Sequence, residues 1–145
     1  MVETTAIRAT ARREGVAGMA RLGGAIFDCD GTLLDSMPMW NSAFTGLCAR
    51  HGLAATDDLR REVEPITLGQ SCELLHERYG LGESARALLD ELEAWVEEQY
   101  ASNVVELPGA RAFVESVAAA GVPMVIATST TSRLVRGALR VHGLD

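Results

Sequence analysis

Two short apolar runs predict strands of a parallel sheet. The first, Ala25–Phe27, follows a pair of glycines and is cut off by polar residues. The second, Val122–Ala127, is rich in β-branched residues and ends in Thr128-Ser129-Thr130. Short apolar runs bounded by turn-forming residues are typical of strands that are buried on both faces of a parallel sheet.

The chain between and after these runs has the apolar spacing of α-helices. Thr56 and Ser84 stand where helix N-caps are expected, and Gly52, Gly80 and Gly121 stand where helices would end. The predicted helices cover 39–51, a short segment after Thr56, 74–79, 84–100, 113–118 and 132–142. The order of elements is therefore a strand, a helical insertion, a helix, a strand and a helix.

This order predicts an α/β fold in which an all-helical module interrupts a parallel sheet. We expect residues 23–36 and 105–145 to form the sheet domain and residues 37–104 to form the helical cap. Residues 1–22 are expected to be a disordered N-terminal tail, with Met19 as an alternative start.

Composition and charge narrow the range of partners. The chain is 48% hydrophobic with a net charge of −7, and no apolar stretch is long enough to span a membrane. An acidic chain argues against nucleic-acid binding. The three cysteines are an odd number and lack the spacing of a metal site, which favours a reduced, cytoplasmic protein.

Asp28 and Asp30 directly follow the first predicted strand, and Thr128 ends the second. Ligands of open α/β sheets bind beyond the carboxyl ends of the strands. Two carboxylates this close repel each other unless one is protonated or a cation lies between them. Mg²⁺ suits such oxygen ligands and attracts phosphate, and the Gly31-Thr32 turn can direct backbone amides toward an anion.

The two aspartates have two other possible interpretations. A calcium loop of the EF-hand type requires a further ligand before its glycine and a preceding helix, and this stretch has neither. The aspartates could also be turn-forming residues without chemistry, which the preceding strand and the following Gly-Thr make the weaker interpretation.

The stretch Phe27-Asp28-Cys29-Asp30-Gly31-Thr32-Leu33 resembles the first motif of the haloacid dehalogenase superfamily. Val125–Ser129 resembles its second motif, a Thr or Ser that ends the next strand. Leu107-Pro108-Gly109 is similar to the point at which the chain of that family returns from a helical cap. The resemblance covers residues 23 to 145 and implies a Rossmann-like parallel sheet, incomplete in this chain, with an inserted all-helical cap.

The resemblance also implies roles for individual residues. Asp28 would be the nucleophile that forms an aspartyl-phosphate, and Asp30 would be the general acid and then the general base. Mg²⁺ would be bound by the Asp28 carboxylate and the Asp30 backbone carbonyl. The residues expected to bind phosphate are Gly31, Thr32, Thr128 and Ser129.

Two later motifs of the family are missing. The chain has no Lys to steady the nucleophile, and it ends at Asp145 before a third strand could supply an acidic pair. Arg133, Arg136 and Arg140 lie on the predicted last helix, which is the wrong place for the Lys role. We interpret the chain as a fragment of a longer protein, the alternative being a truncated relative that has lost catalysis.

The predicted function is a Mg²⁺-dependent phosphatase that acts on a small phosphorylated metabolite. One alternative is a sugar phosphomutase of the beta-phosphoglucomutase type, although Trp40, Leu68 and Cys72 stand where that group has His, Lys and Arg. Another is a non-catalytic module that binds phosphate or Mg²⁺. Residues 1–145 alone are expected to be inactive and to self-associate through an exposed strand edge.

Overall fold

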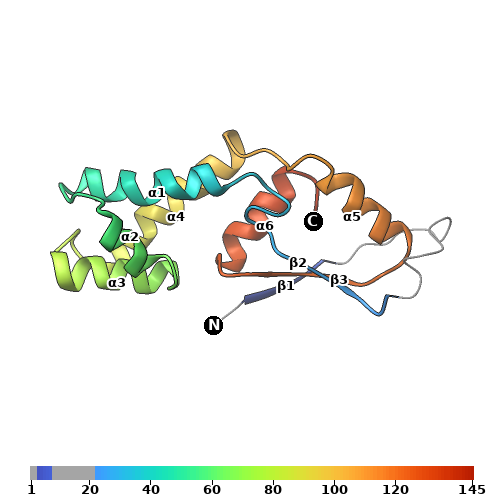
Figure 1. Cartoon of the computed structure of the whole chain (residues 1–145), viewed down its shortest axis with the longest axis horizontal. Coiled ribbons are helices and arrows are strands. Elements are labelled where there is room, and N and C mark those ends of the chain that lie inside the picture. The colour runs from blue at the N-terminus through green and yellow to red at the C-terminus, as the bar shows by residue number, and fades with distance from the viewer. Residues whose placement is uncertain (1–2, 8–21) are drawn as a thin grey trace. The chain divides into compact units, whose positions relative to one another are not determined.

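The computed structural model describes residues 3–7 and 22–145 (Figure 1). The chain divides into two compact units, which we describe separately. Met1–Met37 and Tyr100–Asp145 form the core unit, and Pro38–Gln99 form the helical unit. The insertion thus begins at residue 38 where the sequence predicted 37, and it ends at residue 99 where the sequence predicted 104.

The core unit contains a three-stranded sheet with the strand order β1-β3-β2. β2 (Ala25–Phe27) runs parallel to β3 (Met124–Thr128), with Phe27 opposite Ile126. The α/β class and the parallel pairing of the two predicted strands are therefore confirmed. β2 forms an edge of this sheet, because β3 is its only neighbour among the strands that the structure describes.

β1 (Glu3–Ile7) was not foreseen in the sequence. It pairs antiparallel with β3, with Glu3 opposite Thr128 and Ile7 opposite Met124. These five residues were expected to belong to a disordered tail. They form a strand because β3 has a second edge whose backbone donors and acceptors need partners. The rest of the expected tail, apart from Leu22, lies outside the described residues.

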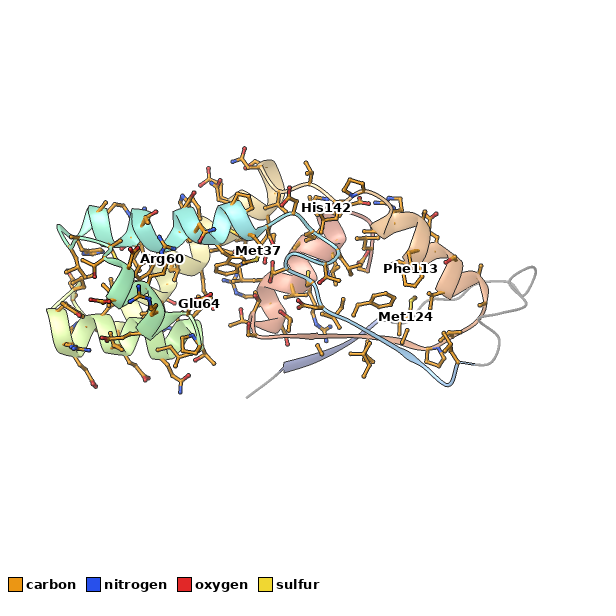
Figure 2. The ribbon with its side chains drawn as sticks, in the orientation of Figure 1. Met37, Arg60, Glu64, Phe113, Met124 and His142 are labelled. Atoms are coloured by element: carbon orange, nitrogen blue, oxygen red, sulfur yellow. The ribbon has the colours of Figure 1, made fainter. Side chains whose placement is uncertain are left out.

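Two helices of the core unit lie on the same side of the sheet (Figure 1). They are α5 (Ala110–Ala119) and α6 (Ser132–Val141). The strand residues that face them are buried, and Phe27 makes an edge-to-face contact with Phe113 at a ring-centroid distance of 5.9 Å. Figure 2 shows the side chains of Phe113 and Met124 in the layer between α5 and β3. The core of this unit therefore forms on one face of the sheet.

The helical unit consists almost entirely of four helices. They are α1 (Met37–Arg50), α2 (Asp57–Val63), α3 (Leu68–Tyr79) and α4 (Ala85–Ser102). The side chains of Leu47, Leu75, Leu88 and Val96 are almost completely buried and form its apolar centre. Across residues 3–7 and 22–145, none of the helices combines the length and the apolar character that crossing a bilayer requires.

Local hydrogen bonds explain where these helices start. The Thr56 hydroxyl accepts the Leu59 N–H at the start of α2, and the Ser84 hydroxyl accepts the Ala87 N–H at the start of α4, as the sequence predicted. At the start of α3, Thr67 and Gln70 form a capping box that was not predicted. Each cap satisfies backbone donors that the first turn of a helix leaves without partners.

The two segments that lead to and from the helical unit pair with each other inside the core unit. The Asp35 N–H donates to the Val105 carbonyl at 2.8 Å, and the Leu107 N–H donates to the Leu33 carbonyl at 2.9 Å. Leu34 is fully buried between these bonds. This short antiparallel pairing fixes the loop that follows β2.

The edge strand leads to a prediction about self-association. Ile26 of β2 points away from the helix-covered face and is 75% exposed. We expect residues 1–145 to self-associate through this strand, and Ile26→Lys to weaken the association by at least about tenfold, because burying one Ile contributes about 1.5–3 kcal/mol. Sedimentation velocity over a range of concentrations measures this change.

Val141→Lys is the matched control, because Val141 is also apolar and exposed but lies on α6. An equal effect of both substitutions, or a strictly monomeric parent chain, would contradict the role of the β2 edge.

Candidate active site

Asp28 lies immediately beyond the carboxyl end of β2, and its side chain is exposed. Its Oδ1 accepts the Cys29 N–H at 2.8 Å, and its Oδ2 lies 3.5 Å from the Thr32 hydroxyl, a long contact. The loop therefore orients the carboxylate while leaving it accessible to solvent. An accessible carboxylate of this kind can act as a nucleophile or as a metal ligand.

The loop after Asp28 folds back on one carbonyl group. The Cys29 carbonyl accepts the N–H groups of Thr32, Leu33 and Leu34 at 3.3, 2.9 and 3.0 Å. Gly31 has φ = +73°, and a Cβ at this position would lie 3.1 Å from the Met37 Cγ. Both its backbone conformation and the space around it therefore favour glycine, and the tight turn brings Asp28 and Asp30 to the same end of the strand.

Asp30 accepts hydrogen bonds from three hydroxyl groups. The Ser36 Oγ donates to Asp30 Oδ1 at 2.6 Å, and the Tyr100 hydroxyl donates to the same oxygen at 2.5 Å. The Thr130 Oγ1 donates to Asp30 Oδ2 at 2.8 Å. The three donors are at most 5% exposed, so they hold the carboxylate from its buried side.

The end of β3 reaches Asp30 through Thr130. Thr128, the last residue of β3, is buried, and its Oγ1 accepts the Thr130 N–H at 3.1 Å. Ser129 lies between these two threonines and is exposed. The structure thus brings the segment after β3 next to Asp30, and Thr130 makes the direct contact.

Three residues of this site were missed by sequence reasoning. Ser36 lies at the end of the first predicted segment of the sheet domain, Tyr100 at the end of the predicted helix 84–100, and Thr130 in the polar stretch that ends the second predicted strand. Tyr100 is 70 positions from Asp30, and no local pattern marks it as a polar partner. The position of Thr130, two residues after Thr128 at the end of the strand, was a weak indication that it could belong to the site.

Cys29 lies between the two aspartates and is completely buried. Burial, together with the negative charges of Asp30 and Asp28, raises the pKa of the Cys29 thiol to about 12. The thiol therefore stays protonated near neutral pH and is a poor nucleophile.

The oxygen atoms of this loop fit part of a Mg²⁺ site. In the part of the chain that the structure describes, no three His, Cys, Asp or Glu residues form a group that could hold a metal ion. The exposed Asp28 carboxylate and the Asp30 backbone carbonyl are hard oxygen donors of the type that Mg²⁺ prefers. Because Mg²⁺ keeps several water ligands, two protein oxygens fit part of its coordination shell.

The sequence pattern of the haloacid dehalogenase-like hydrolases matches residues 25–145. The chain belongs to this family. The haloacid dehalogenase-like match includes the loop with Asp28 and Asp30, β3 and the whole helical unit.

Two curated relatives of this haloacid dehalogenase-like chain have named activities. It is 30% identical over 126 residues to hexitol phosphatase A of Escherichia coli strain K12, covering 86% of this chain and 56% of the relative. It is 26% identical over 120 residues to a phosphorylated carbohydrates phosphatase of Thermotoga maritima, covering 83% and 56%. The chain thus spans little more than half the length of these relatives.

Solved structures share the fold. A Thermotoga maritima protein named as a candidate beta-phosphoglucomutase has a TM-score of 0.64 and 25% identity, covering 85% of this chain and 57% of that protein. A haloacid dehalogenase family hydrolase from Deinococcus radiodurans, solved with bound phosphate and sodium, has a TM-score of 0.55 and 21% identity, covering 86% and 54%. At 21% identity, this second likeness concerns the fold alone.

The thiol of Cys29 provides a test of the site's local environment. In the double variant Cys48→Ala/Cys72→Ala, we expect Cys29 to react with a thiol reagent at least about 10³-fold more slowly in the native protein than in denaturant. The rise in its pKa from 9.0 to about 12 lowers the thiolate fraction by this factor, and burial adds to it. Measurement of the reaction rate at mildly alkaline pH, without divalent cations, checks this.

Equal rates in the native and denatured protein would show that Cys29 is accessible and that the loop is not folded as described.

Proposed function

We propose that the complete protein is a Mg²⁺-dependent phosphatase that acts on a small phosphorylated metabolite through an aspartyl-phosphate on Asp28. The observation that carries this proposal is the contrast between two carboxylates in one loop. Asp28 is exposed, whereas Asp30 is held by three buried hydroxyl groups. One carboxylate is thus placed to attack and the other to transfer protons, a division set by their different environments.

In the first proposed step, a carboxylate oxygen of Asp28 attacks the phosphorus atom of the substrate. The bond between phosphorus and the leaving oxygen breaks as the new bond forms. Asp30, protonated at this stage, gives its proton to the leaving oxygen, so that an alcohol departs and Asp30 becomes a carboxylate. The product of this step is a phosphoryl group on Asp28.

In the second step, Asp30 acts as the general base. Its carboxylate removes a proton from a water molecule, whose oxygen attacks the phosphorus atom. The bond between phosphorus and Asp28 breaks, inorganic phosphate leaves and Asp30 is protonated again. One water molecule is consumed in each cycle, and both aspartates return to their starting states.

The phosphate group must be bound and its charge compensated for a carboxylate to attack it. The Asp28 carboxylate and the Asp30 carbonyl would bind Mg²⁺, which would supply positive charge beside the phosphate. We propose that Gly31, Thr32, Thr128 and Ser129 contribute hydrogen-bond donors to the phosphoryl oxygens. The position of Thr32 and Ser129 on exposed loop ends next to the aspartates supports this role.

The names of the relatives guide the proposed substrate. A hexitol phosphatase and a phosphorylated carbohydrates phosphatase favour a phosphate monoester of a sugar or sugar alcohol. A cytoplasmic location fits such a substrate and the three buried free thiols. A panel of sugar and hexitol phosphates, assayed by release of inorganic phosphate, tests the substrate class.

A phosphomutase is the second candidate, favoured by the solved structure named as a candidate beta-phosphoglucomutase. Against it, Cys72 is completely buried within α3, and burial raises its pKa to about 11, so its thiol offers no charge to a sugar phosphate. Transfer of phosphate between positions of one sugar, rather than to water, would favour the mutase. Phosphate or Mg²⁺ binding without turnover would favour a non-catalytic module.

Substitution of the two aspartates tests the assigned roles. In the complete protein, we expect Asp28→Asn to abolish phosphate release, because an amide is a poor nucleophile. Asp30→Asn should lower kcat by about 10²–10⁴-fold, the usual contribution of a general acid–base group. Steady-state kinetics measures both, with circular dichroism as the check that each variant is folded. Full turnover by Asp28→Asn would exclude the aspartyl-phosphate.

Removal of divalent cations tests the proposed cofactor. Treatment with a chelator should abolish phosphate release by the complete protein, and added Mg²⁺ should restore it, because the attack of a carboxylate on a phosphate ester needs charge compensation. Isothermal titration should show Mg²⁺ binding that is weakened in Asp28→Asn. Activity that persists after exhaustive chelation would contradict the role of the metal.

A further inference from the structure

The two oxygens of the Asp30 carboxylate have different surroundings. Oδ1 accepts two hydroxyl donors, Ser36 at 2.6 Å and Tyr100 at 2.5 Å. Oδ2 accepts one, Thr130 at 2.8 Å. A carboxylate accepts and a hydroxyl donates, so both oxygens of Asp30 are held by hydrogen bonds from buried side chains.

The donors are themselves held in place. Ser36 is 0% exposed and Tyr100 is 2% exposed, so both hydroxyls donate to Asp30 from positions that solvent hardly reaches. Thr130 is fixed through its backbone, because its N–H donates to the Oγ1 of Thr128. The carboxylate of Asp30 is therefore fixed by three segments of the core unit.

We propose that Ser36, Tyr100 and Thr130 are positioning residues that fix the orientation of the Asp30 carboxylate for its acid–base role. This inference rests on the proposed phosphatase function and adds to it the hydroxyl groups that control proton transfer. None of the three hydroxyls is assigned contact with substrate. They act through Asp30 by holding both of its carboxylate oxygens as hydrogen-bond acceptors.

Two of the three positioning residues lie at the ends of the insertion in the sequence. The chain passes from the core unit to the helical unit after Met37 and returns at Tyr100. Ser36 thus precedes the first passage by one residue, and Tyr100 is the first residue after the second. A residue close to each connection therefore donates a hydrogen bond to Asp30 Oδ1.

The test separates the two chemical steps by the choice of leaving group. Nitrophenolate leaves without protonation, so the first step on p-nitrophenyl phosphate needs no acid, whereas the second step still needs Asp30 as base. For Tyr100→Phe in the complete protein, we expect a rapid burst of nitrophenolate followed by slow turnover. Turnover of a hexitol phosphate, which needs the acid from the start, should fall by roughly 10–100-fold with no burst of released alcohol.

Matched variants control for a general loss of structure. Tyr79→Phe removes the hydroxyl of the other tyrosine, which lies partly exposed on α3, and should keep parental kinetics with both substrates. Thr130→Val removes the hydroxyl at nearly constant volume and should reproduce the burst. Thr130→Ser restores a hydroxyl and should return turnover to within about threefold of the parent protein.

Two results would overturn the proposal in different ways. If the parent protein hydrolyses both esters but Tyr100→Phe and Thr130→Val slow them equally without a burst, the hydroxyls are structural and the positioning role is wrong. The same conclusion follows if Thr130→Ser is as impaired as Thr130→Val. If the parent protein hydrolyses neither ester, the phosphatase function itself fails, and this inference fails with it.

Discussion

The half-buried carboxylate of Asp30 needs hydrogen-bond partners, because the side chains that surround its oxygens are buried. A poorly hydrated carboxylate without partners is strongly destabilising, and a hydrogen bond to a charged group contributes about 1.5–3 kcal/mol. Its three hydroxyl partners come from the loop after β2, from the end of α4 and from the segment after β3. This one group therefore determines how three distant segments of the chain meet.

The same loop produces two carboxylates with different properties. The turn closed on the Cys29 carbonyl leaves Asp28 exposed and directs Asp30 toward the buried hydroxyls. Cys29, buried between them, remains a neutral thiol and takes no part in the proposed chemistry. These different environments are the basis for proposing a nucleophile and a proton-transfer group two residues apart.

Local sequence patterns were sufficient for part of this structure. The apolar runs at 25–27 and 122–127 predicted the parallel strands, and Thr56 and Ser84 predicted helix starts, because these features depend on neighbouring residues. Tyr100 could not be recognised as a partner of Asp30, because its position on α4 fits an apolar face and its partner is 70 residues away. β1 was missed for a similar reason. It forms by pairing with a free edge of β3, and β3 lies far from it in the sequence.

The central claim of this account is that Asp28 carries the phosphoryl group while Asp30 transfers protons. It is tested most directly by quenching the complete protein with acid during turnover of p-nitrophenyl phosphate and locating the phosphoryl group by peptide mass spectrometry. We predict a phosphorylated Asp28, more abundant in Asp30→Asn because hydrolysis of the intermediate is slowed. A turnover-competent protein with phosphate on another residue, or with none in either form, would contradict the account.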